Sequence, residues 1–238
     1  ESNTANNTDV DNQAGGEQLT PLFADPGVSV NEIPAGTPGT TVTTTVILSN
    51  NGSTTTTFTT TVVINGATTT LVNTLAPNTT ESVVISVPLT ATGATVTATI
   101  TDSSVPDSNL GNNSDSENAG ALFADVTTEV DLPANAPAGT VVTGTVVFTN
   151  SAAAGATASA VVGTVTLSNG ESYTYSVGDL TPGASATRTF TTTVPSTLGT
   201  VLEVTSTVAT ATPESNTANN TDVDNQAGGE QLTPLFAD

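Results

Sequence analysis

Hydrophobic and polar residues alternate along most of this chain. In the stretch 41–48, Val42, Val46 and Leu48 fall on the face opposite to Thr43 and Thr45. A period of two residues is typical of a β-strand that turns one face towards a core. The same criterion predicts strands at 28–33, 55–64, 68–75, 81–87 and 94–101, and again at 128–132, 141–149, 157–167, 172–177, 186–194 and 201–210. We find no stretch with the period of a helix.

Turn-forming residues separate these predicted strands. Asn65-Gly66 predicts a two-residue hairpin turn in which both residues need positive φ, and Asn169-Gly170 predicts a second hairpin. The stretches 76–78 and 181–183, each with a proline, mark further turns. About seven short strands per hundred residues are typical of a β-sandwich. We therefore expect an all-β protein of two tandem antiparallel sandwiches with about seven strands each.

The chain contains two levels of repetition. Residues 1–25 and 214–238 are identical letter for letter, 213 positions apart. An older duplication relates PGTTVTTTVILSN (38–50) to AGTVVTGTVVFTN (138–150), and PDSNLGNNSDSEN (106–118) to PESNTANNTDVDN (213–225). The letters LFAD recur at 22–25, 122–125 and 235–238. We therefore expect a stretch of a longer periodic chain: the tail of a preceding module (1–20), two modules (21–120 and 121–233) and the start of the next module (234–238).

The charge balance excludes several classes of partner. The chain has a net charge of −21, and Arg188 is its single cation. Binding to nucleic acid or to anionic lipid needs lysine and arginine, so neither is expected as a partner. No apolar run is long enough to span a membrane. The acidity favours solubility in salty or calcium-rich water, and we therefore expect an extracellular or cell-surface location.

The composition also argues against an enzyme. Histidine, lysine and cysteine are absent, so serine and threonine have no partner to activate them as nucleophiles. We expect no catalytic residues and no certain cofactor. The lone Arg188 is expected to pair with a nearby carboxylate, with docking on a carboxylate of a neighbouring unit as the alternative.

Acidic residues concentrate where modules meet. Of the 22, 17 lie in 1–25, 102–131 and 214–238. Calcium binds oxygen ligands of this kind, which makes it a candidate cofactor. An EF-hand loop is not formed, since Ala14 stands at the glycine position and Thr20 at the glutamate position. The alternative is that these residues form turns and are solvated. The calcium candidates are Asp107, Asn112, Asp115, Glu117, Glu214, Asn219, Asp222 and Asp224.

Several sequences could carry glycans. Threonine is the commonest residue, with 53 copies, and sequons of the N-x-S/T type arise readily in such a composition. Threonine-rich strands such as 54–61 would suit O-glycosylation, or simply form threonine pairs on an exposed sheet. The candidate N-glycosylation sites are Asn6, Asn51, Asn78, Asn112 and Asn219.

The order of motifs resembles a known family. Each module opens on FADPGVSV or FADVTTEV, continues with a strand that ends in asparagine (TVILSNNG, TVVFTNSA) and a proline turn (APNTTESV, TPGASATR), and closes on PDSNLGNN or PESNTANN. This order is similar to the immunoglobulin-like repeats of prokaryotic surface proteins, above all to the cell-adhesion-related domain CARDB. The resemblance implies two immunoglobulin-like sandwiches and extracellular stalk or adhesion modules without catalytic residues.

These observations together favour a structural role. We expect a repeat unit of an extracellular fibre or surface stalk whose partners are neighbouring copies of itself, built either as one long covalent array or from separate subunits that exchange strands. An adhesin that presents a ligand site on sandwich loops is the alternative, although the loops at 50–54, 91–93 and 151–156 are short and lack aromatic residues. The residues expected at contacts between modules are Asn6, Asn7, Asp9, Asp11, Leu22, Phe23, Leu122, Phe123, Leu235 and Phe236.

Overall fold

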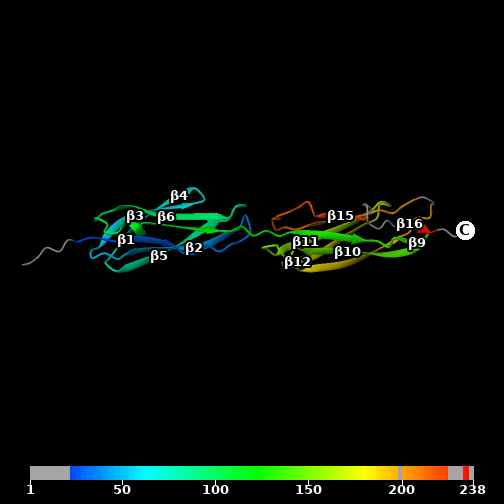
Figure 1. Cartoon of the computed structure of the whole chain (residues 1–238), viewed down its shortest axis with the longest axis horizontal. Helices are drawn as coiled ribbons and strands as arrows, with labels where there is room; N and C mark the ends of the chain where they lie inside the picture. The colour runs from blue at the N-terminus through cyan, green and yellow to red at the C-terminus, as the bar shows by residue number, and fades with distance from the viewer. Residues whose placement is uncertain (1–21, 198–199, 225–232, 236–238) are drawn as a thin grey trace, which may run out of the picture. The chain divides into compact units, whose positions relative to one another are not determined.

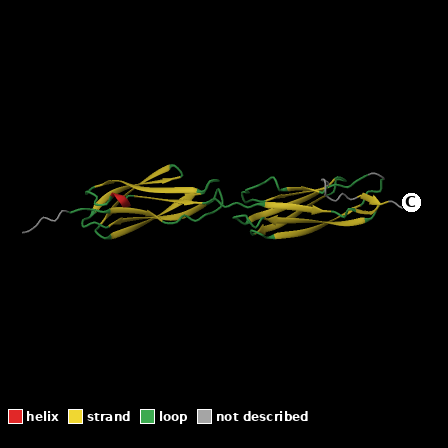
Figure 2. Cartoon of the chain, viewed as in Figure 1, coloured by secondary structure: helices red, strands yellow, loops and turns green. Residues whose placement is uncertain are grey.

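The structure is a computed structural model that describes residues 22–197, 200–224 and 233–235. Its strands belong to two compact units (Figures 1 and 2). Of the described residues, the first unit contains 22–33, 43–87 and 95–118, and the second contains 34–42, 88–94 and those from 119 onwards. Because the units interleave along the sequence, the module boundaries inferred from the repeats stay a prediction.

The first sandwich consists of a three-stranded and a four-stranded sheet. Their strand orders are β1-β2-β5 and β4-β3-β6-β7. Strand β1 runs antiparallel to β2, and β3 runs antiparallel to both β4 and β6; Val28 of β1, for example, pairs with Leu48 of β2. The strands are β1 (Pro26–Val30), β2 (Thr41–Asn50), β3 (Thr56–Ile64), β4 (Ala67–Leu75), β5 (Thr79–Pro88), β6 (Ala94–Ser103) and β7 (Ser114–Ala119).

The core of this sandwich comes from the alternating positions that predicted its strands. Five core side chains have an exposed fraction of at most 1%: Val46 and Leu48 of β2, Phe58 and Val62 of β3, and Val96 of β6. β-branched residues fit the pleated surface between the two sheets. Sequence alternation and the buried face therefore agree.

The hairpin between β3 and β4 forms as predicted. Asn65 and Gly66 connect the two strands, and Ile64 pairs with Ala67 across the turn. Their φ angles are +50° and +85°, so both central residues lie in the left-handed region that this turn requires. The prediction of positive φ at Asn65-Gly66 is confirmed.

The second sandwich repeats this arrangement. Its sheets have the orders β13-β10-β8 and β12-β11-β14-β15, and β16 pairs with β9 in parallel. The strands are β8 (Val126–Asp131), β9 (Asn135–Pro137), β10 (Val141–Asn150), β11 (Ala158–Leu167), β12 (Ser172–Leu180), β13 (Ser185–Thr193), β14 (Val204–Ala209), β15 (Thr221–Val223) and β16 (Thr233–Leu235).

The core of the second sandwich is built around two phenylalanines. Phe148 of β10 is fully buried and Phe190 of β13 nearly so. The ring of Phe148 lies against Gly163 of β11, where an added Cβ would come within 2.0 Å of the Cζ atom of Phe148. The ring therefore occupies the space that any other residue at position 163 would need.

The all-β fold class with two antiparallel sandwiches is confirmed. The strands predicted by alternation all occur, with ends shifted by a few residues. The predicted ranges did not include β7 and β15 of the closing motifs or the short parallel pair β9 and β16. A 3-10 turn at Leu110–Asn112 is the only helix within the part of the chain that the structure describes. The described residues thus contain no candidate for a membrane-spanning helix.

Candidate functional site

The opening motif of the first sandwich docks on the closing motif of the same sandwich. Ala24, from LFAD, is fully buried and forms a parallel bridge with Asp107. The N–H of Ala24 donates to the carbonyl oxygen of Pro106 (3.1 Å), and its carbonyl oxygen accepts from the N–H of Ser108 (2.9 Å). The two ends of the module are thus held together by backbone hydrogen bonds.

The second sandwich uses the same contact. Ala124 is fully buried and forms a parallel bridge with Glu214. Its N–H donates to the carbonyl oxygen of Pro213 (3.0 Å), and its carbonyl oxygen accepts from the N–H of Ser215 (2.9 Å). The docking is therefore conserved between the modules although the closing motifs differ in sequence.

A fully buried asparagine ties the opening motif to two other segments. The Oδ1 atom of Asn150 accepts from the N–H of Asp125 (3.1 Å), and its Nδ2 atom donates to the carbonyl oxygens of Ala156 (3.0 Å) and Leu180 (2.9 Å). Asn50 makes the equivalent bonds in the first sandwich. Sequence reasoning recorded this asparagine only as the end of a strand, and its recurrence in both modules was the signal that could have revealed its role.

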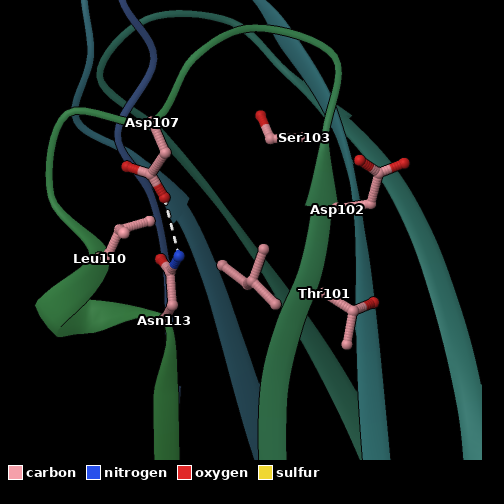
Figure 3. Close-up of a pocket in the computed structure, with 7 residues that line it drawn as sticks. Thr101, Asp102, Ser103, Asp107, Leu110 and Asn113 are labelled. Atoms are coloured by element: carbon pink, nitrogen blue, oxygen red, sulfur yellow. Dashed lines mark hydrogen bonds between the residues drawn. The ribbon is translucent and has the colours of Figure 1, made fainter.

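Two adjacent asparagines of each closing motif bind carboxylates. Asn112 Nδ2 donates to Asp25 Oδ1 (2.9 Å), which joins the closing motif to the opening motif. Asn113 Nδ2 donates to Asp107 Oδ2 (2.8 Å), as Figure 3 shows. The second sandwich has the same two bonds, from Asn219 to Asp125 (2.9 Å) and from Asn220 to Glu214 (3.0 Å). These bonds give four junction acids a role inside their own sandwich: Asp25, Asp107, Asp125 and Glu214.

Aspartates of the closing strands accept backbone hydrogen bonds from the opening strands. Asp115 Oδ2 accepts from the N–H of Val30 (2.8 Å), and Asp222 Oδ2 accepts from the N–H of Val130 (2.7 Å). The buried Asp224 accepts from the N–H of Leu132, the residue that follows β8 (3.0 Å). A hydrogen bond to an ionised group contributes about 1.5–3 kcal/mol, so the acids help to close each sandwich.

A small pocket lies beside the closing motif of the first sandwich (Figure 3). Its volume is about 270 Å³, and its lining includes Asp102, Asp107, Leu110 and Asn113 but no aromatic residue. Ligand pockets usually range from about 300 to 1,000 Å³ and are largely apolar. The pocket therefore gives no support for a small-molecule site.

Seven of the eight calcium candidates, all except Glu117, act individually as hydrogen-bond acceptors or donors. Within residues 22–197, 200–224 and 233–235, no three acidic side chains form a group that could hold a metal ion. Glu117 is half-buried on β7. One feature still suits a cation: four asparagine Oδ1 atoms are buried without a hydrogen-bond partner, which is unusual for buried polar atoms. They belong to Asn112, Asn113, Asn219 and Asn220. Calcium binding at these motifs remains a proposal.

The structure divides the glycosylation candidates into two groups. Asn51 and Asn78 are exposed and lie outside the strands. Asn112 and Asn219 use the side-chain nitrogen that would carry the glycan to bind Asp25 and Asp125. Modification at the second pair would break these bonds. The remaining candidate, Asn6, lies outside the described residues.

The residues expected at contacts between modules differ in exposure. Leu22, Phe23 and Leu235 are 67%, 43% and 51% exposed, whereas Leu122 and Phe123 are half-buried. The other expected residues lie outside the described part of the chain: Asn6, Asn7, Asp9, Asp11 and Phe236. Whether this set contacts a neighbouring module stays a prediction.

Backbone bonds hold the LFAD residues that the structure describes. The carbonyl oxygen of Phe23 accepts from the N–H of Ser53 (2.9 Å), and that of Phe123 accepts from the N–H of Gly155 (3.0 Å). The carbonyl oxygen of Leu235 accepts from the N–H of Ala138, the residue that follows β9 (2.9 Å). Backbone hydrogen bonds therefore help to fix each copy of the motif.

Two tyrosines bridge the open edge between the sheets of the second sandwich. The hydroxyls of Tyr173 and Tyr175 on β12 donate to carbonyl oxygens of β13, that of Tyr175 to Thr189 at 3.0 Å. Burial, together with the neighbouring Tyr173, raises the pKa of Tyr175 above its usual value. Arg188 Nη1 donates to the carbonyl oxygen of Thr187 on the same strand (2.9 Å). These side chains cover backbone groups at the edge of β13.

Comparison with solved structures finds chains to which this chain is similar. The chain is similar to the crystal structure of a CARDB domain from Pyrococcus furiosus in complex with di-metal ions, with a TM-score of 0.39, 19% identity, and coverage of 43% of this chain and 97% of that one. It is also similar to red sea bream transglutaminase, with a TM-score of 0.35, 13% identity, and coverage of 92% of this chain and 32% of that one. No family model and no curated protein matches the chain. The CARDB domain, which the sequence motifs resemble, is thus among the solved structures to which this chain is similar.

Proposed function

We propose that this chain is a repeat unit of an extracellular fibre or long surface stalk in which immunoglobulin-like modules follow one another head to tail. One observation carries the proposal: the segment that occurs twice, at 1–25 and 214–238, contains a closing motif followed by an opening motif. Its second copy closes the second sandwich through Glu214, Asn219 and Asp222 before the chain continues into β16. The repeated segment is thus a junction between modules.

A junction of the same kind occurs inside the chain. Its first half, 106–118, closes the first sandwich through the bridge of Asp107 with Ala24 and the bond of Asp115 to β1. Its second half, 122–125, opens the second sandwich through Ala124. Each half makes the hydrogen bonds of its own sandwich, so any number of modules can follow one another with the same local contacts. This property supports a repeating array.

A polypeptide of three consecutive 213-residue repeats tests this proposal. We expect every repeat to fold, with a contour length in electron micrographs that grows by a constant increment for each repeat added. Added repeats that stay unfolded, or that collapse into compact aggregates, would contradict the proposal.

The array is built in one of two ways. In a covalent array one long polypeptide carries all the repeats, and tandem duplication directly explains the letter-perfect identity. With separate subunits, a segment such as 1–20 or its C-terminal counterpart adds a strand to the adjoining module. The mass of native material after complete denaturation decides between them. A species near the 23.5 kDa of this chain excludes the covalent array, and material of several hundred kilodaltons excludes separate subunits.

An adhesin with a ligand site on sandwich loops is less well supported. The pocket beside the loop 151–156 measures about 280 Å³ and is lined by Leu122, Phe123, Ser215 and small residues of that loop. It is smaller than usual ligand pockets and has no charged group to orient a ligand. We therefore propose that the chain acts as a spacer outside the cell, with other copies of the chain as its partners.

A further inference from the structure

The outer face of each four-stranded sheet carries a continuous row of hydroxyl groups. In the first sandwich, Thr61 pairs with Thr70 on one side and with Thr99 on the other, and the Oγ1 atom of Thr99 lies 3.1 Å from the Oγ atom of Ser114. We call these four residues, Thr70, Thr61, Thr99 and Ser114, the first hydroxyl row. Each is exposed or half-buried, so the row faces outwards.

The second sandwich has a row of the same kind on the corresponding strands. Thr164 pairs with Thr174 and with Thr207, and Thr207 pairs with Thr221. These four residues form the second hydroxyl row, and all are exposed or half-buried. The two modules share little sequence in these strands, yet each presents one hydroxyl from every strand of the sheet.

Both rows avoid charge in a chain with a net charge of −21. The acids of the closing strands alternate with the row residues and bind the opening strands instead, as Asp115 and Asp222 do. In the first sheet, the next outward position of β3 after Thr61 is Thr59, which lies opposite Asp102, so one carboxylate flanks the first hydroxyl row. Two copies that approach through these rows therefore bring fewer carboxylates together than two copies that approach through the acid-rich closing motifs.

The chemistry of a hydroxyl row also makes it complementary to itself. A hydroxyl both donates and accepts a hydrogen bond, whereas a carboxylate only accepts. Strands lie about 4.8 Å apart, and outward residues along one strand lie about 7 Å apart, so two such faces offer donors and acceptors at matching spacings. A partner that needs cationic or aromatic contacts would find neither in the rows. The chemistry favours a second copy of this chain.

We propose that the hydroxyl rows of two copies pack face to face and associate the chains side by side. This inference goes beyond the end-to-end array and does not depend on it. The four short side chains of one row cover less than the roughly 800 Å² per partner of a standard interface, so a single pair binds weakly. Repetition along a fibre would multiply the contact through effective concentration.

Charge insertion into the rows tests the proposal. In sedimentation equilibrium, the full chain is expected to self-associate weakly at high protein concentration, and more strongly as salt screens the remaining acids. The double variant Thr61→Glu/Thr164→Glu is expected to lower the association constant at least tenfold. The matched control, Thr43→Glu/Thr143→Glu, adds the same charge to exposed positions of the three-stranded sheets and is expected to lower it much less.

A second variant separates loss of the hydroxyls from loss of folding. Thr61→Ser/Thr164→Ser keeps both hydroxyls and is expected to associate like the parent, with circular dichroism to verify folding of every variant. The proposal is overturned if the parent stays monomeric at all salt concentrations, if the control weakens association as much as the row variant, or if the serine variant is folded but fails to associate. Binding of a neutral polysaccharide through the rows without self-association would also overturn it.

Discussion

Replacement of Asn150 by alanine should break the contact that joins the opening motif to the second sandwich. The side chain is fully buried and serves three backbone groups: the half-buried N–H of Asp125 and the buried carbonyl oxygens of Ala156 and Leu180. Each buried group left unpaired costs about 1–3 kcal/mol. The expected loss is therefore about 3–5 kcal/mol, a large part of the roughly 5–15 kcal/mol that stabilises a domain.

Tyrosine fluorescence provides an assay that reports on one sandwich. The chain has two tyrosines, Tyr173 and Tyr175, and no tryptophan, and both tyrosines lie on β12 of the second sandwich. In urea, unfolding free energy falls by about 1–3 kcal/mol per molar for small domains, so Asn150→Ala should lower the tyrosine midpoint by about 1–5 M. The matched variant Asn50→Ala removes the equivalent side chain from the first sandwich, and its effect should appear in circular dichroism.

A small effect would refute this reasoning. Substitutions at exposed positions usually change stability by less than about 0.5 kcal/mol. If Asn150→Ala costs less than about 1 kcal/mol by tyrosine fluorescence, its three hydrogen bonds do not hold the opening motif in place. The conserved position of Asn50 and Asn150 would then need another explanation.

Three further predictions concern the core, pH and calcium. Gly163→Ala should destabilise the second sandwich by about 1–3 kcal/mol in urea unfolding, because the new Cβ meets the ring of Phe148, whereas Gly120→Ala, with open space around it, should not. Burial raises the pKa of Tyr175 in the folded protein. The protonated hydroxyl therefore stabilises the fold below the ordinary tyrosine pKa, and this stabilisation is lost as the pH rises through the raised pKa. Alkaline unfolding monitored by circular dichroism should therefore shift in Tyr175→Phe, and an unshifted profile would contradict this. If calcium binds, a chelator should lower the thermal midpoint, and an unchanged midpoint removes calcium from the proposal.

Strands and turns could be predicted from short stretches of sequence. The alternation around Val46 and Leu48 predicted both a strand and its buried face, because side chains of a strand point alternately to opposite sides. Asn65-Gly66 predicted positive φ at both positions because few other residues tolerate it. These features depend on neighbours in the sequence, so no knowledge of the tertiary structure was needed.

The candidate site was predicted less completely. Sequence reasoning located the acids at the junctions but assigned them to calcium or to solvated turns. In the structure, Asp222 accepts from the N–H of Val130, 92 residues away. The buried asparagine at 150 likewise acts on segments that come together only when the sandwich closes. Neither bond leaves a periodic mark in the sequence, because each pairs one side chain with the backbone of a distant segment.

The sequence by itself determined the all-β class, the repetition of two related modules, the segment shared by 1–25 and 214–238, and the lack of basic groups for nucleic acid. These follow from alternation, identity and composition, which are local or countable properties. Only the tertiary structure decided that Asp115 and Asp222 close the sandwiches, and that hydroxyls from four strands line up in uncharged rows. The physical reason is that strand order and register bring residues from distant segments together, and local sequence does not specify those pairings.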